Sequence, residues 1–183
     1  MAILKIARMG HPVLAQRAQE VADPTAPEIA RLVEDMTQTM FDAQGRGLAA
    51  PQVHVPLRVV VFITPEDAAY PGVTAIVNPV ITVLTEEMTE GWEGCLSVPG
   101  LRGLVPRHTR LRYTGVAPDG TPIDRTVEGF HAVVVQHEFD HLDGVLYPRR
   151  MDDLGKLIFD SEMRWFLPRR DIQPDDALEE AAQ

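Results

Sequence analysis

Two histidines separated by three residues carry the clearest chemical signal in the chain. His137 and His141 flank Glu138, Phe139 and Asp140. On an α-helix the two imidazoles would lie on one face, about 6 Å apart along the axis, and could hold one metal ion. Glu138 would then lie beside the ion as a general base rather than a ligand. A buried helix that carries two histidines for packing gives the same pattern, so the motif alone leaves both interpretations open.

A catalytic metal site commonly has three protein ligands, so a third ligand must come from elsewhere in the chain. Cys95 is the only cysteine, and a thiolate is a strong ligand for zinc or ferrous iron. Glu162 is the alternative, as in proteases whose following helix supplies a glutamate. Other metalloproteases place a further histidine six residues after His141, where this chain has Tyr147. Cys95 as a thiol nucleophile is a weaker interpretation, because it leaves Glu138 without a role.

The composition is that of an ordinary globular protein. With 183 residues, 45% hydrophobic and 24% charged, the chain suits one catalytic domain, which we expect over residues 1–167. Residues 168–183 are predicted to form a mobile acidic tail. The net charge of −10 argues against direct nucleic-acid binding, and a single cysteine excludes an internal disulfide. No secretory signal and no apolar run of the ~18 residues that span a membrane is visible, so we expect a cytoplasmic protein without membrane contact.

Helices are predicted near both ends of the chain and strands between them. Thr25 and Glu28 have the spacing of a capping box, and an amphipathic helical pattern follows to about Gly45. Strands are predicted from β-branched runs and turn residues over 57–63, 73–84, 85–92, 104–116 and 121–128. The last two should form a hairpin at residues 117–120, which include Asp-Gly. Residues 93–100 interrupt the strand pattern with Gly and Pro.

The histidine segment is predicted to be a helix over 130–142, although its three consecutive valines favour a strand. A strand would place His137 and His141 about 13 Å apart, too far for one ion. Gly144 fits a helix C-terminal cap, and valines on several sides imply burial nearly all round. Another helix is predicted over 154–167. The expected fold class is α+β, with small antiparallel or mixed β-sheets packed around this central helix, and an N-terminal and a C-terminal helix.

Three motifs in a fixed order make the sequence resemble peptide deformylases. They are Gly-x-Gly-Leu-Ala-x-x-Gln at 45–52, Glu-Gly-Cys-Leu-Ser at 93–97 and Gln-His-Glu-x-Asp-His-Leu at 136–142. The similarity extends over roughly residues 3–165. The resemblance implies a metal-dependent hydrolase that removes the formyl group from the N-terminal formyl-methionine of newly made polypeptides.

The resemblance also implies roles for single residues. The metal ligands would be Cys95, His137 and His141. A metal-activated water would attack the formyl carbon, with Glu138 as general acid/base. The donors to the formyl oxygen would be the Gln52 amide and the backbone N–H of Leu96.

Further residues are expected to bind the substrate. The resemblance implies that Gly47 holds the peptide through its backbone and that Arg102 lies near the peptide groove. Phe130, Val133 and Val134 come one to two helical turns before His137. They could line an apolar pocket for the methionine side chain or pack as plain core.

A Cys-His-His set suits Zn(II), Fe(II), Ni(II) or Co(II), and the resemblance implies Fe(II) as the native ion. The expected partners are formyl-methionyl nascent peptides. Some bacterial deformylases contact the ribosome through a basic C-terminal helix, which the acidic end of this chain does not match, so transient ribosome contact stays open. Bacterial or organellar origin stays open as well.

Two positions depart from the family pattern. Arg46 stands where a small apolar residue is usual, and His54 where glycine is usual. Both could change the rim of the pocket, so the peptide preference beyond methionine stays open. The competing hypotheses are a zinc endopeptidase, which the His-Glu-x-x-His motif alone would support, and an inactive metal- or peptide-binding relative, against which the intact Glu138 argues.

Overall fold

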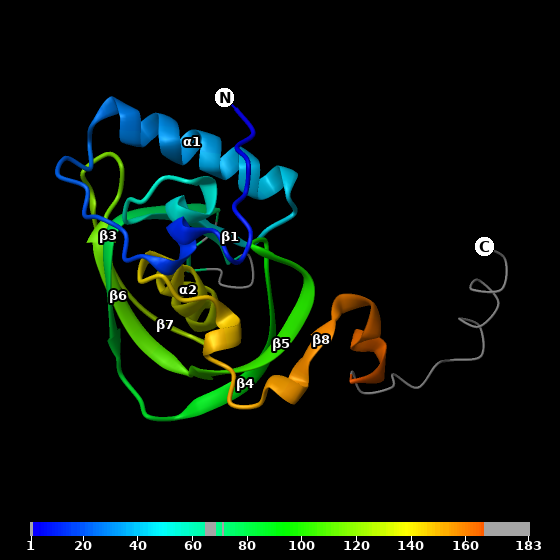
Figure 1. Ribbon diagram of the computed structural model, residues 1–183. Coiled ribbons are helices and arrows are strands. Elements are labelled where there is room, and N and C mark those ends of the chain that lie inside the picture. The colour runs from blue at the N-terminus through cyan, green and yellow to red at the C-terminus, as the bar shows by residue number, and fades with distance from the viewer. Residues whose placement is uncertain (1, 65–68, 71, 167–183) are drawn as a thin grey trace, which may run out of the picture.

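One helix, α2 (Gly129–Leu142), lies at the centre of the fold, and two β-sheets wrap around it (Figure 1). The computed structural model describes residues 2–64, 69–70 and 72–166. Ten of the 14 residues of α2 are buried. The predicted helix over 130–142 is therefore confirmed. Its valines are tolerated in a helix because apolar neighbours surround it on most sides.

Both sheets of the described residues are antiparallel, which confirms the α+β class. The larger sheet has the order β1-β2-β3-β6-β7 and the smaller the order β4-β5-β8. The strands are β1 (Gly47–Ala49), β2 (Val59–Ile63), β3 (Val73–Val83), β4 (Met88–Cys95), β5 (Val98–His108), β6 (Arg110–Val116), β7 (Pro122–Glu128) and β8 (Leu157–Phe159).

The two helices cover opposite faces of the larger sheet. Successive side chains of a strand point to opposite faces, and β2 uses both. Val60 and Phe62 pack in the core that contains α2, whereas Val59 and Val61 pack in the core that contains α1 (Pro27–Asp42). The continuous apolar run of β2 therefore anchors the sheet between the helices.

The start of α1 differs from the predicted capping box. The helix begins at Pro27, and Ala26 precedes it without a side-chain cap. Thr25 instead donates to Asp23 from both its backbone N–H (2.9 Å) and its hydroxyl (2.7 Å). The Thr25 hydroxyl, which the capping box would need, is thus bonded within the turn that precedes the helix.

The predicted strand over 104–116 is wrong as a single element. Its first part belongs to β5 in the smaller sheet and its second to β6 in the larger, with Thr109 between them. The hairpin at residues 117–120 is confirmed, because β6 pairs with β7. Residues 93–100 are also mostly strand: β4 runs to Cys95 and β5 begins at Val98, with Leu96 and Ser97 as the turn between them. The pairing register of the two strands shifts between Gly94 and Cys95, next to this turn.

The predicted C-terminal helix over 154–167 is wrong over its described residues. The chain forms short 3-10 turns at Leu154–Lys156 and Asp160–Trp165, with β8 between them. Pairing of β8 with Leu101–Gly103 of β5 satisfies the backbone instead of helical hydrogen bonds. Leu167 and the predicted tail at 168–183 lie outside the described residues. Within the described ranges, no helix is long and apolar enough to cross a membrane.

Candidate metal centre

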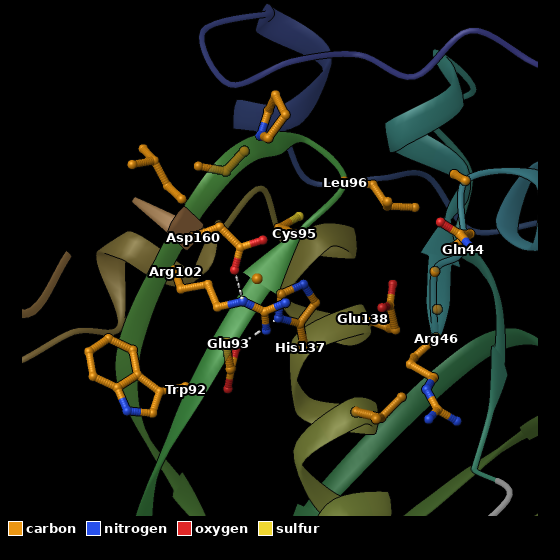
Figure 2. Close-up of a pocket in the computed structure, with 18 of the residues that line it drawn as sticks. Gln44, Arg46, Trp92, Glu93, Cys95, Leu96, Arg102, His137, Glu138 and Asp160 are labelled. Carbon is orange, nitrogen blue, oxygen red and sulfur yellow. Dashed lines mark hydrogen bonds and ion pairs between the residues drawn. The ribbon is translucent and has the colours of Figure 1, made fainter. Parts of the chain in front are cut away.

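Three side chains, two from α2 and one from β4, converge at one face of α2. Cys95 comes from the end of β4, and His137 and His141 come from one face of α2. One ligand atom from each lies within 4.8 Å of the others, and the Cys95 Sγ lies 3.4 Å from the His141 Nε2. The sequence-predicted ligand set is therefore brought together. Figure 2 shows two of its members, Cys95 and His137, among the residues that line the neighbouring cavity.

The surroundings of this cluster fit a divalent cation. The Nδ1 of His137 donates to the Glu93 carboxylate (2.7 Å), which leaves the Nε2 for a metal, as carboxylates commonly do for ligating histidines. Burial lowers the pKa of His141 well below its usual value, which keeps that ring neutral as a ligand must be. Burial also opposes charge on His137, but Cys95 and Glu93 outweigh it and raise the pKa of His137 well above its usual value. Cys95 and Glu93 thus favour a positive charge at this position, and a bound metal cation would provide that charge.

A buried network of charges, which sequence reasoning missed, holds His137. Arg107 lies between two carboxylates, Glu93 (2.7 and 3.0 Å) and Asp140 (2.7 Å). Arg150 also donates to Asp140 (2.6 and 3.1 Å). Burial raises the pKa of Glu93, but hydrogen bonds from His137 and Arg107 prevail and lower it, so this carboxylate stays charged. Both acids lie inside the quoted motifs, whereas nothing in the sequence marks the two arginines.

Glu138 lies at the base of the site and is 5% exposed. Its Oε2 is buried without a hydrogen-bond partner among the described residues. Burial raises the pKa of Glu138 to about 7, a value suited to taking up and releasing a proton near neutrality. Gly47 packs against this carboxylate so closely that a Cβ there would lie 2.1 Å from the Glu138 Oε1. The glycine therefore makes room for the Glu138 side chain.

Gln52 presents its amide N–H groups to the cluster. Its Oε1 accepts from the backbone N–H of Ala49 (2.8 Å), which fixes the orientation of the amide. Its Nε2 consequently faces the Ser97 Oγ (3.2 Å) and the Cys95 Sγ (3.6 Å). The side chain is 1% exposed, so the donor is held in place.

A cavity of about 470 Å³ opens onto these groups. The predicted site residues that line it are Gly47, Gln52, Cys95, Leu96, Arg102, Phe130, Val133, Val134, His137 and Glu138. His141 lies behind the cavity wall and is 1% exposed. Trp92 and Asp160 also line the cavity and were not predicted; Asp160 accepts from the Arg102 Nε (2.5 Å).

The two departures from the family pattern have different outcomes. Arg46 lines the cavity as expected. The expectation for His54 is wrong, because this residue is not among the cavity-lining residues. His54 instead follows the 3-10 helix Ala50–Val53 with a φ of 66°, in the left-handed region that glycine adopts most easily.

Comparison with known proteins identifies the family. Residues 3–157 match the sequence profile described as polypeptide deformylase. The chain is 54% identical over 159 residues to peptide deformylase 1 of Nitrosomonas europaea, which covers 84% of this chain and 90% of the relative. This chain belongs to the peptide deformylase family. Peptide deformylase 1 of Xanthomonas campestris is 48% identical over 170 residues, or 90% of this chain and 99% of the relative.

Solved deformylase structures share the fold. The enzyme of Thermus thermophilus superposes with a TM-score of 0.74 at 43% identity, over 81% of this chain and 86% of that one. An Acinetobacter baumannii deformylase solved with Met-Ala-Ser bound gives a TM-score of 0.76 at 34% identity, over 82% and 99% of the two chains. Of the two enzyme classes considered from the sequence, family membership therefore supports a deformylase and not a zinc endopeptidase. Accordingly, Glu162 lies outside the ligand cluster and accepts from Trp165 instead.

Proposed function

We propose that this deformylase removes the formyl group from the N-terminal formyl-methionine of new polypeptides by metal-dependent hydrolysis. The observation that carries the proposal is the convergence of Cys95, His137 and His141 beside Glu138 at one end of an apolar-walled cavity. The peptide-bound Acinetobacter relative supports a peptide as the occupant of the cavity. The reaction would take place where formyl-methionyl chains are made, which for the bacterial relatives is the cytoplasm.

Cys95, His137 and His141 would hold the cation, with Fe(II) as the native ion and Zn(II), Ni(II) or Co(II) as substitutes. Such an ion lowers the pKa of water and polarises a carbonyl oxygen. The residues of the chain prepare the ligands for it. Glu93 orients the His137 ring, and the backbone N–H of Ser97 donates to the Cys95 sulfur (3.4 Å), which holds the side chain in place.

Glu138 would move the proton during hydrolysis. It takes a proton from the attacking water as the new C–O bond forms at the formyl carbon. It then gives that proton to the amine nitrogen of methionine as the C–N bond breaks, so the products are formate and a free N-terminus. A pKa raised to about 7 by burial lets the same carboxylate serve in both steps.

Gln52 and Leu96 would stabilise charge on the formyl oxygen. The fixed orientation of the Gln52 amide supports this role, as does the position of Leu96 in the cavity wall next to Cys95. One such donor typically contributes about 2.7–4 kcal/mol to the transition state.

The edge of β1 would hold the peptide backbone. The Arg46 carbonyl accepts from the N–H of Ile63 (2.8 Å), so residue 46 directs its backbone to β2. Gly47, opposite Phe62, therefore directs its N–H and C=O to the open edge of the sheet, where a peptide could pair with it. Phe130, Val133 and Val134 would receive the methionine side chain, and Arg102 would lie beside the residues that follow it.

Release of formate from formyl-Met-Ala-Ser tests the proposal. Protein purified anaerobically and loaded with Fe(II) should release formate, and failure to do so would overturn it. Glu138→Ala should keep the bound metal but lose activity, because the variant removes the proton carrier and no ligand. Cys95→Ala should lose both metal and activity, and a variant that keeps the metal would contradict the assigned ligand set.

A further inference from the structure

An ion pair between Arg102 and Asp160 forms part of the cavity wall. The Arg102 Nε donates to the Asp160 carboxylate (2.5 Å), and both side chains line the cavity. Asp160 reaches Arg102 because β8 pairs with β5 so that Ile158, two positions before Asp160, lies opposite Arg102. Figure 2 shows this contact as a dashed line. Two residues that are 58 positions apart in the chain therefore form one charged contact at the site.

The part of the Arg102 guanidinium that Asp160 does not bind faces the site. Its two Nη atoms make no hydrogen bond to another described residue. A Cβ on Gly94 would lie 3.7 Å from the Arg102 Cζ and Nη1, so the guanidinium lies along the backbone one residue before the ligand Cys95. The Nη groups can therefore donate to an oxygen atom of a peptide in the cavity.

The net charge of the ion pair decides which kind of oxygen is favoured there. Arg102 alone would bind a carboxylate more strongly than a neutral carbonyl, because an ionised acceptor makes the stronger hydrogen bond. Asp160 supplies a negative charge at hydrogen-bond distance, so the net charge of the pair is zero. A volume of about 470 Å³ corresponds to a sphere about 10 Å across, which is the distance over which charges interact at 0.1 M salt. A carboxylate inside the cavity would therefore interact with this pair.

We propose that Asp160 is a specificity-determining residue that keeps this enzyme from favouring short formyl-peptides over long chains. The inference rests on the proposed function and adds a substrate preference to it. A short peptide ends in a free carboxylate inside the cavity, whereas a long chain presents neutral backbone carbonyls there. Because Asp160 neutralises Arg102, the terminal carboxylate of a short peptide gains no advantage over a carbonyl.

Peptides that differ only in their terminal group test the inference. Formyl-Met, formyl-Met-Ala and formyl-Met-Ala-Ser are each compared as free acid and as amide with the metal-loaded enzyme. The acid-to-amide ratio of kcat/KM should be near one for the wild type. Asp160→Asn leaves Arg102 with an uncompensated positive charge and should raise the ratio about threefold to fivefold for at least one length, mostly through KM. The rise should shrink between about 0.02 and 0.5 M salt, because ions screen exposed charges.

Three further variants separate the effect of charge from a change in structure. Arg102→Gln should lower the ratio below one, because Asp160 is then uncompensated, and it tests the pair even if Asp160→Asn does not fold. The double variant Arg102→Gln/Asp160→Asn has the pair charge of the wild type and should return the ratio to near one. Asp124→Asn is the matched control. Asp124 pairs with Arg112 at similar exposure (54% and 51%, against 54% and 41% for Asp160 and Arg102), but neither residue lines the cavity, so the ratio should not change.

A longer peptide tests the dependence on distance. In formyl-Met-Ala-Ser-Gly-Gly-Gly the three added residues move the carboxylate about 10 Å further along an extended chain. The acid-to-amide ratio for this peptide should therefore be the same in the wild type and in Asp160→Asn.

An unchanged ratio in Asp160→Asn at every length would overturn the inference and leave the proposed function standing, since formate is still released. An equal rise with the longer peptide, or in Asp124→Asn, would also overturn it, because the effect would then belong to the net charge of the protein. A wild-type ratio of threefold or more would show that Asp160 does not neutralise Arg102. Absence of formate from every acid and amide would overturn the proposed function together with this inference.

Discussion

Replacement of Gly47 by alanine should cripple catalysis while leaving the metal in place. The added Cβ would lie 2.1 Å from the Glu138 Oε1 and 2.4 Å from the Cδ, whereas ordinary contacts begin at 3.4 Å. The carboxylate or β1 must therefore yield by about 1 Å. Since α2 is buried on most sides, the Glu138 side chain will move more readily than its helix.

A misplacement of about 1 Å in a catalytic group can cost on the order of 100-fold in rate. We therefore expect kcat for formyl-Met-Ala-Ser to fall about 100-fold in Gly47→Ala, equivalent to about 2.7 kcal/mol of barrier. Metal content should stay at the wild-type level, because the three atoms nearest to the added methyl group all belong to Glu138, which is not one of the three ligands.

Gly91→Ala is the matched control. It makes the same chemical change in β4, where a Cβ meets nothing within 4 Å. Steady-state kinetics and metal analysis on both variants separate the effects. A wild-type kcat for Gly47→Ala would refute the argument that this glycine makes room for Glu138, and loss of metal would show that the strain reaches the ligands.

Three further outcomes follow from the buried charges. Arg107→Met should lower the free energy of unfolding in urea by about 3–5 kcal/mol, because it leaves Glu93 and Asp140 buried without their shared partner; a loss below about 1 kcal/mol would contradict this. In the metal-free protein, burial raises the pKa of Glu138 from 4.5 to about 7. Glu138 is then neutral in both states at low pH, and stability is lost as pH rises from its unfolded pKa through its folded pKa. Metal-free Glu138→Gln should therefore match the wild type near pH 4 and exceed it by about 3 kcal/mol at pH 8 in urea titrations, whereas equal stability at both pH values would refute the shift. Chelation should abolish activity and lower the melting temperature, and Ni(II) should restore both; activity that persists after complete metal removal would exclude the proposed chemistry.

The part of the site that lies on one helix could be predicted from sequence spacing. Residues four positions apart lie on the same face of any helix, so the positions of His137 and His141 relative to each other on α2 do not depend on the rest of the fold. The third candidate ligand, Cys95, could be predicted because it is the only cysteine of the chain and lies within a motif of the family. The structure adds the contact itself: at the end of β4, the Cys95 Sγ lies 3.4 Å from the His141 Nε2 of α2.

Other features depend on pairings that local patterns do not encode. Arg107 joins Glu93 and Asp140, which lie 14 and 33 positions away, and nothing near Arg107 in the sequence marks it. The segment predicted as a helix over 154–167 has helical spacing of its apolar residues, yet Leu154 and Phe159 are 64% and 65% exposed and only Leu157 of the described part packs against a core cluster. Pairing with β5 decided its structure instead.

The most direct test of the central claim is a metal titration of the metal-free enzyme with formate release as the signal. The initial rate on formyl-Met-Ala-Ser should rise linearly with added Ni(II) up to one equivalent per chain and then stay constant. Cys95→Ala should give no such rise at these concentrations, because one of the three ligands is gone. Full activity without metal, or an unchanged titration for Cys95→Ala, would contradict the account.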